Sequence, residues 1–197
     1  MTNIAVITGT TRNARQTPKQ ALWVQKALEA KEGVTVTALD LRDFPMPFFD
    51  EPVSPRYNPD RAPEGAVKAW LDALSQADAY VVVTPEYNHS IPGVLKNAFD
   101  YVGFEMNQKP SAIVSHGSVG GARAAMHLKE ILSESKTVPI PEFVAFHGVS
   151  EGIDDEGKLS EELKANPYGP QAALTGLVDS LVWYTEALKA ARQALGS

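Results

Sequence analysis

The stretch 80–93 constrains the fold of this 197-residue chain more than any other segment. It begins with the β-branched and aromatic run 80–84, which is typical of a parallel strand buried on both faces. Pro85 stops the strand because it has no N–H to donate to a neighbouring strand. Pro92 and Gly93 then open an apolar-periodic stretch, and proline suits the first turn of a helix. The segment therefore predicts a strand, a short exposed loop and a helix.

The same alternation of strand and helix recurs along the chain. Further strands are expected at 3–8, 34–39, 111–115 and within 137–146. Helical spacing of apolar residues predicts further helices at about 21–28, 64–76 and 125–132. Pro139 and Pro141 push the last strand toward an edge of the sheet. Five such strands predict one α/β domain, residues 1–197, with a doubly wound parallel sheet in the order 2-1-3-4-5.

Two other segments are expected to lack regular structure. The stretch 40–63 is rich in proline and aromatic residues, which favours a binding edge or a subunit contact over a disordered loop. The stretch 151–170 is polar and interrupted by glycine and proline, so it is expected to be a loop. An apolar stripe along 174–195 then predicts a long amphipathic helix that packs on the sheet.

Composition excludes several classes of protein. The chain has no cysteine, which excludes disulfides, zinc–thiolate sites, iron–sulfur clusters and thiol catalysis. Its net charge of −6 argues against general nucleic-acid binding. No apolar run is long enough to span a bilayer, and the N-terminus lacks the basic region of a signal peptide. We therefore expect a cytoplasmic enzyme or binding protein without a membrane or nucleic-acid partner.

Three loops, 9–17, 85–90 and 115–121, should converge beyond the carboxyl ends of their strands, where open α/β sheets bind ligands. The first loop has the composition of a phosphate cradle, and Thr17 and Pro18 suit the start of the next helix. Its hydroxyl, amide and guanidinium groups come from Thr10, Thr11, Thr17, Gln16, Arg12 and Arg15. The loop lacks a dinucleotide G-x-G-x-x-G and a P-loop G-K-[ST], so an ordinary solvated turn is the alternative. Asp40 stands where a ribose-binding acid would be, but the glycines that usually accompany one are missing.

The second loop could offer a flat surface to a planar ligand, and the third loop could let a ligand approach its backbone closely. Backbone groups of 86–88 could face the edge of a heterocycle, and Tyr87 or His89 could cover a planar ring. The alternatives are a partly buried core tyrosine, a surface histidine and a solvated or subunit-contact carboxylate at Glu86. Glycines in the third loop permit close approach to a ligand, although a flexible turn would carry them equally well. The histidines do not stand at metal-ligand spacing, so no metal site is expected, and no Ser-His-Asp arrangement stands out.

The loop sequences resemble those of the NADPH-dependent FMN reductases, a family of the flavodoxin-like fold that includes soluble quinone, azo-dye and chromate reductases. The matching segments are Gly-Thr-Thr-Arg at 9–12, the block 84–98 and Gly-Gly-Ala-Arg at 120–123. One departure concerns the first loop, where the family often carries Ser and Asn in place of residues 15–17. The stretch 151–197 carries no matching motif beyond a terminal helix.

This resemblance implies a bound FMN and assigns residues to each part of it. The phosphate would lie on Thr10, Arg12, Arg15, Gln16 and Thr17. The isoalloxazine ring would contact Pro85, Glu86, Tyr87 and Asn88, largely through backbone atoms near its N5 edge. Ser115 and Gly117 would line the pyrimidine side of the ring. Members of the family are commonly homodimers or homotetramers with the flavin near a subunit interface.

The implied activity is an FMN-dependent NAD(P)H oxidoreductase. NADPH, or NADH, would deliver hydride to flavin N5, and a quinone, azo compound, free flavin or similar small-molecule acceptor would take the electrons. No side chain is needed as an acid or base, so no catalytic residue is assigned. The alternatives are a flavin-binding sensor or electron carrier that acts through protein contacts, and a flavin-free interaction protein of the same fold.

Overall fold

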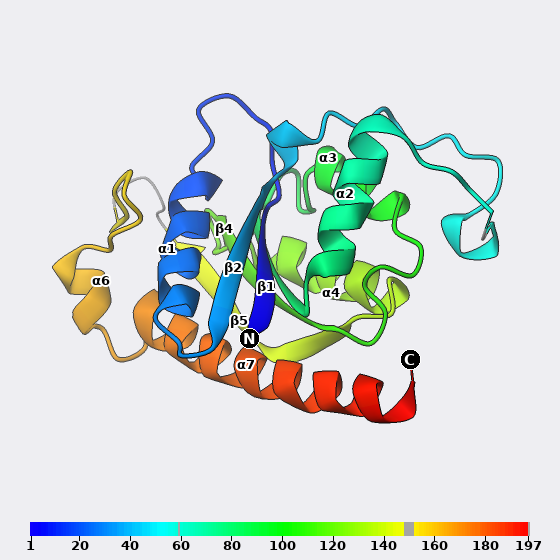
Figure 1. The fold of residues 1–197 in the computed structure, drawn as a ribbon. Coiled ribbons are helices and arrows are strands. Elements are labelled where there is room, and N and C mark those ends of the chain that lie inside the picture. Colours follow the sequence, from blue (N-terminus) through cyan, green and yellow to red (C-terminus); the bar gives the residue numbers. More distant parts are fainter. Residues whose placement is uncertain (59, 148–151, 197) are drawn as a thin grey trace.

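A five-stranded parallel sheet organises the chain in a computed structural model that describes residues 1–58, 60–147 and 152–196. The strands are β1 (Thr2–Thr8), β2 (Val34–Asp40), β3 (Ala79–Pro85), β4 (Pro110–Gly117) and β5 (Val138–His147). Their order is β2-β1-β3-β4-β5, and every neighbouring pair is parallel. The predicted doubly wound sheet and its order are therefore confirmed (Figure 1).

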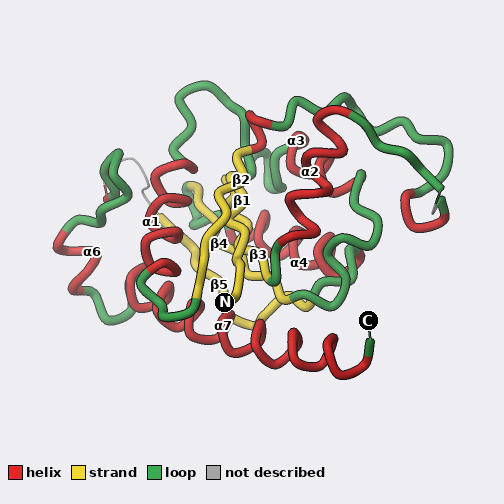
Figure 2. Tube along the Cα trace, in the orientation of Figure 1, coloured by secondary structure: helices red, strands yellow, loops and turns green. Residues whose placement is uncertain are grey.

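Helices cover both faces of this sheet, as the tube in Figure 2 also shows. They are α1 (Thr17–Glu29), α2 (Gly65–Gln76), α3 (Gly93–Asp100), α4 (Ala122–Glu134), α6 (Glu161–Ala165) and α7 (Pro170–Leu195). Apolar residues of α1 and α7 pack on one face, and those of α2, α3 and α4 pack on the other. None of the described helices is long and apolar enough to cross a membrane.

Successive side chains of the central strand β3 point to opposite faces of the sheet, so the sheet has one hydrophobic core on each face. Tyr80 and Val82 of β3 pack with α2, α3 and α4, whereas Val81 and Val83 pack with α1 and α7. All four side chains are fully buried, as expected for a parallel strand with helices on both faces. The proline-containing β5 lies at the edge of the sheet, which confirms the prediction made from its sequence.

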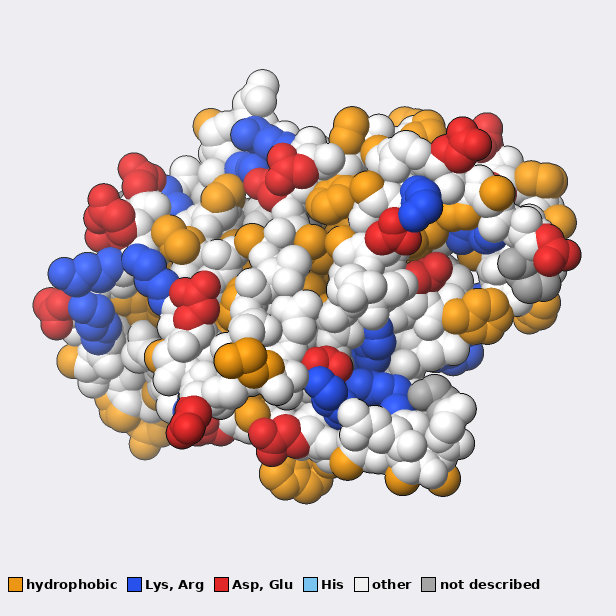
Figure 3. Space-filling model, in the orientation of Figure 1, with side chains coloured by type: hydrophobic (Ala, Val, Ile, Leu, Met, Phe, Trp, Pro, Cys, Tyr) orange, Lys and Arg blue, Asp and Glu red, His pale blue; other side chains and the backbone are white. Residues whose placement is uncertain are grey.

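The stretch 40–63 is more ordered than its proline content predicts. It contains two 3₁₀ turns, Leu41–Asp43 and Pro55–Tyr57, so the prediction of wholly irregular structure was wrong. Phe44 packs edge-on against Trp70, with ring centres 5.4 Å apart. Phe48 and Tyr57 are instead 85% and 83% exposed. Figure 3 shows hydrophobic side chains on the surface over this part of the molecule.

One additional helix and one helix start also differ from the predictions. The stretch 152–170 contains the short helix α6, whose N-terminus is capped by Ser160 accepting from the Leu163 N–H at 3.4 Å. The prediction of a loop there was wrong, and residue 151 lies outside the described residues. At α1 the N-cap residue is Gln16, and Thr17 is the first residue of the helix, with its hydroxyl bonded to His116.

Candidate functional site

The loops that follow β1 and β3 touch at the carboxyl end of the sheet. The Tyr87 hydroxyl lies 3.1 Å from the Thr10 hydroxyl, and the Arg12 guanidinium lies over the Tyr87 ring at 5.8 Å from its centre. Thr10 is buried and Arg12 is exposed, so this contact extends from the interior to the surface. The predicted meeting of these two loops is therefore present in the structure.

Two arginines clamp the backbone of the first loop. The Arg15 guanidinium donates to the Thr10 carbonyl and to both carboxylate oxygens of Asp40, at 2.7 Å for the Nη1–Oδ1 pair. Arg42 donates to the carbonyls of Thr11 and Arg12, at 3.3 and 2.8 Å. Three successive carbonyl oxygens of the first loop, those of Thr10, Thr11 and Arg12, are thus bonded to arginines, which fixes the backbone of this loop.

Asp40 anchors this clamp at the end of β2. It also accepts from the Arg42 N–H at 2.9 Å, so its carboxylate contacts both arginines. Burial alone would raise the pKa of Asp40, but the hydrogen bonds and charges of Arg15 and Arg42 lower it below its ordinary value. The side chain of Arg15 is only 7% exposed. Asp40 therefore contacts a protein cation, and the Arg15 guanidinium is already paired with a carboxylate.

Glu86 joins the second loop to α4. Its N–H donates to the His116 carbonyl at 2.9 Å. Its carboxylate accepts from Arg123 Nε at 2.6 Å and from the N–H groups of Arg123 and Ala124 at 3.1 and 3.4 Å. Burial would raise the pKa of Glu86, but these donors lower it below its ordinary value. The side chain is 6% exposed, so it caps α4 and is not a solvated loop carboxylate.

A tight turn at 87–90 carries the remaining residues of the second loop. Tyr87 and Ser90 exchange both backbone hydrogen bonds, at 2.9 and 3.0 Å. Asn88 and His89 between them have φ values of 50° and 68°, as a type I′ turn requires. Ser90 in turn contacts His127 of α4, with 2.7 Å between Oγ and Nδ1. This turn therefore holds the Tyr87 ring against the first loop.

The third loop packs tightly on the end of β4. Ser115 is fully buried, and its hydroxyl donates to the Gly120 carbonyl at 2.8 Å. Gly121 has φ +73°, and a Cβ there would lie 2.8 Å from both N and O of His116. A Cβ on Gly117 would reach 3.4 Å from the Glu86 Cβ, so the second and third loops are in contact. Ser115 thus holds the third loop against the end of β4 through its bond to Gly120.

His116 connects the third loop to the first, and sequence reasoning missed this role. Its Nε2 lies 2.9 Å from the Thr17 hydroxyl, and both side chains are buried. Burial lowers the pKa of His116 to about 4, so the imidazole is neutral near pH 7. The only signal in the sequence was its place between a strand and a glycine-rich turn.

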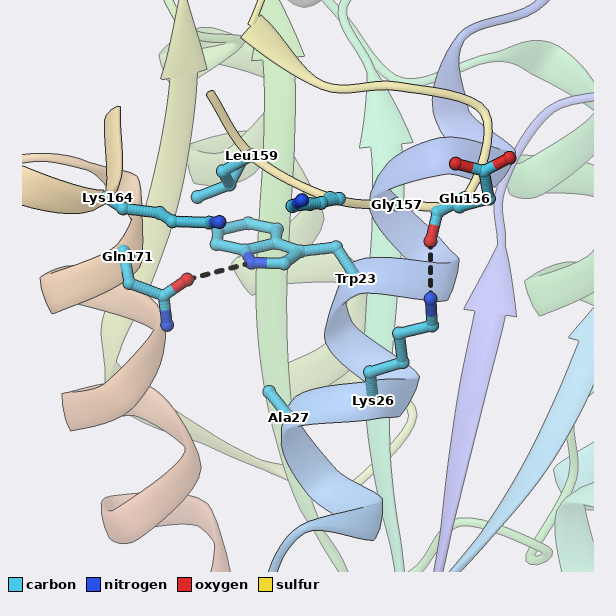
Figure 4. A pocket seen from close by; sticks show the side chains of 9 residues that line it. Trp23, Lys26, Ala27, Glu156, Gly157, Leu159, Lys164 and Gln171 are labelled. Carbon is cyan, nitrogen blue, oxygen red and sulfur yellow. Dashed lines mark hydrogen bonds between the residues drawn. The ribbon is translucent and has the colours of Figure 1, made fainter. Parts of the chain in front are cut away.

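A separate cavity of about 360 Å³ lies beside α1, away from these loops (Figure 4). Trp23 lines it and donates its indole N–H to Gln171 of α7 at 3.2 Å. Two of its lysines are already engaged, Lys26 with the Glu156 carbonyl at 2.7 Å and Lys164 with Glu161 at 2.8 Å. None of the described residues that line the cavity belongs to the predicted cofactor set.

The fold and the three loops define a flavodoxin-like protein, and the comparisons with known proteins identify its family. The model of the NADPH-dependent FMN reductase family matches residues 2–151, so the chain belongs to that family. It is thus an oxidoreductase that uses FMN and NAD(P)H.

Individual relatives agree with this assignment. The NAD(P)H-dependent FMN reductase of Schizosaccharomyces pombe is 38% identical over 128 residues, which are 65% of this chain and 64% of that protein. A quinone reductase of Pseudomonas putida is 29% identical over 174 residues, covering 82% of this chain and 87% of the relative. Among solved structures, the flavoenzyme NAD(P)H:(acceptor) oxidoreductase FerB of Paracoccus denitrificans superposes with a TM-score of 0.73 at 28% identity, covering 95% of this chain and 98% of that one.

Proposed function

We propose that this protein passes hydride from NADPH or NADH through FMN to a quinone, an azo compound, free flavin or a similar small acceptor. The observation that carries the proposal is the convergence of three loops, with the first loop's carbonyls held by Arg15 and Arg42. When bound, the flavin supplies the redox chemistry at its N5. The quinone as acceptor is supported by the relative from Pseudomonas putida.

The first loop would hold the phosphate end of the cofactor. Peptide N–H groups at the start of α1, with the side chains of Arg12 and Gln16, would surround the phosphate, because the helix dipole favours an anion there. The buried side chains of Thr10 and Thr17 would support this loop from inside, since their hydroxyls contact Tyr87 and His116. Gln16 Oε1 is buried without a hydrogen-bond partner among the described residues, so it fits a hydroxyl of the ribityl chain. Arg15 would support the phosphate site indirectly. Its bonds to the Thr10 carbonyl and to Asp40 would hold the first loop in the conformation that binds the phosphate.

The other two loops would hold the ring. Backbone atoms of Pro85, Glu86, Tyr87 and Asn88 would lie along its N5 edge, because the Glu86 carboxylate is taken up by α4. Gly117 would lie on the pyrimidine side of the ring, and the buried Ser115 would support that contact by holding Gly120. No side chain has to exchange a proton; the residues would orient the ring so that the nicotinamide and then the acceptor can reach the same exposed face.

Activity measurements test this proposal directly. Protein reconstituted with FMN should oxidise NADPH when a quinone or ferricyanide is supplied as acceptor. Omitting the acceptor should reduce the rate to that of oxygen alone, which separates acceptor reduction from slow oxidation in air. Absence of NADPH and NADH oxidation with every acceptor would refute the proposed activity.

The clamp on the first loop gives a quantitative prediction. Asp40→Asn should raise the FMN dissociation constant about tenfold, because Arg15 loses its charged partner and releases the loop. Asp179→Asn is the matched control, since Asp179 also pairs with a cation, Lys31, but on the exposed surface. Fluorescence titration with FMN should show no more than about a twofold change in that control. Equal effects of the two substitutions would refute the role of the clamp.

We also propose that the protein is a homodimer or homotetramer. Phe48 and Tyr57 expose large aromatic side chains on the stretch 40–63, and burying them against a second copy of the chain would remove this apolar surface from water. Light scattering at micromolar concentration should give a mass above the monomer, and Phe48→Ser should lower it. A monomeric mass for the unmodified chain would refute the assembly.

A further inference from the structure

One buried histidine contacts all three loops of the proposed cofactor site. The side chain of His116 reaches the start of α1, where Nε2 lies 2.9 Å from the Thr17 hydroxyl. Thr17 is fully buried and His116 is 8% exposed, so water does not compete for this bond. Because Thr17 is the first residue of α1, the bond ties the end of β4 to the beginning of that helix.

The backbone of the same residue holds the other two loops. The carbonyl of His116 accepts from the Glu86 N–H at 2.9 Å, which fixes the residue that follows β3. A Cβ on Gly121 would lie 2.8 Å from the N and the O of His116, so the third loop rests directly on this peptide. The peptide of His116 therefore contacts the second and third loops, and its side chain contacts the start of α1.

The imidazole acts here as a neutral connector. Burial disfavours its charged form and lowers the pKa of His116 to about 4, so at neutral pH one ring nitrogen carries a proton and the other accepts. A threonine hydroxyl both donates and accepts, so it pairs with either tautomer of the ring. His116 therefore does not attract the phosphate by charge; it sets the position of the helix that does.

We propose that His116 is a positioning residue for FMN, which rests on the proposed function. Its hydrogen bond to Thr17 holds the N-terminus of α1 in register with the second and third loops. A side chain of similar length that keeps a polar terminal group should preserve this register, whereas an apolar one should not. Loss of the bond also leaves the Thr17 hydroxyl buried and unpaired, which adds to the effect.

Three substitutions in the full chain test the proposal through FMN affinity. His116→Leu should raise the FMN dissociation constant about tenfold, which is about 1.4 kcal/mol. His116→Gln should stay within about threefold of the unmodified protein, because its amide reaches toward the position of Nε2. Ser111→Ala is the matched control: it removes a buried hydroxyl that lies 3.0 Å from Thr137 Oγ1, at the opposite end of β4. It should lower stability without changing FMN affinity.

The measurement is a titration of flavin-free protein with FMN, followed by the quenching of flavin fluorescence, with urea unfolding of each variant alongside. Rescue by glutamine together with an unaffected Ser111→Ala supports the proposal. Equal losses of affinity in His116→Leu and Ser111→Ala, or unchanged affinity in His116→Leu, overturn it. If His116→Leu does not fold, the proposal is overturned when the FMN dissociation constant of His116→Gln differs by more than about threefold from that of the unmodified protein. Failure of the unmodified protein to bind FMN would refute the proposed function, which distinguishes the two outcomes.

Discussion

Gly121→Ala should lower the free energy of unfolding by about 3 kcal/mol. Gly121 has φ +73°, where an L-residue is strained, and its new Cβ would lie 2.8 Å from two backbone atoms of His116 and 2.9 Å from the Ser115 Cβ. Those atoms belong to a strand buried between two layers of helices, so they have little room to move. The third loop should therefore be displaced and FMN binding weakened more than tenfold.

A glycine-to-alanine substitution at another position should instead raise the free energy of unfolding. Gly176 lies on the exposed side of α7, where a Cβ would meet no described atom within 4 Å. Gly176→Ala should stabilise the protein by about 1 kcal/mol, because alanine favours a helix interior over glycine. Urea unfolding of both variants, with FMN titration of each, measures the contrast. Similar stability and affinity in the two variants would contradict the tight packing of the third loop.

Acidification from pH 6.5 to 4 should remove about 3 kcal/mol of stability through His116 alone. The ordinary histidine pKa of 6.5 applies to the unfolded chain, whereas burial lowers the pKa of His116 to about 4 in the folded state. The unfolded state therefore binds the proton first as the pH falls. The stabilisation is complete above pH 6.5 and is lost progressively toward pH 4.

Other groups with shifted pKa values act mainly outside this window. The pKa values of Asp40, Asp78 and Glu86 are lowered from ordinary values of 3.8, 3.8 and 4.5, so their contributions are lost chiefly at lower pH. Urea unfolding at a series of pH values should show the loss in the unmodified protein and a smaller one in His116→Gln. An identical pH dependence in both proteins would contradict a buried neutral His116.

Local patterns in the sequence were sufficient to predict the sheet. The apolar runs at β1, β3 and β4 are buried on both faces, so their continuity marks them as central strands. The prolines of β5 placed it at an edge for a reason that depends only on its own backbone. The meeting of the loops then followed from topology, because parallel strands bring their carboxyl ends to the same edge.

Contacts between side chains far apart in sequence could not be predicted in this way. Arg15 was assigned to the phosphate because its charge suits one, but the structure pairs it with Asp40, 25 residues away. His116 and Thr17 are 99 residues apart, and nothing in the hydrophobic period marks them as partners. The helix α6 was missed for another reason: the capping Ser160 was present, but the glycines and prolines around it favoured a loop.

The absorbance spectrum of the purified protein, recorded before and after anaerobic addition of NADPH, tests the central claim most directly. The account predicts a flavin band, present on purification or after incubation with FMN, that bleaches when NADPH is added. A flavin band that persists with both NADPH and NADH would indicate a sensor or electron carrier instead. Absence of any flavin band after incubation with FMN would contradict the assignment of all three loops.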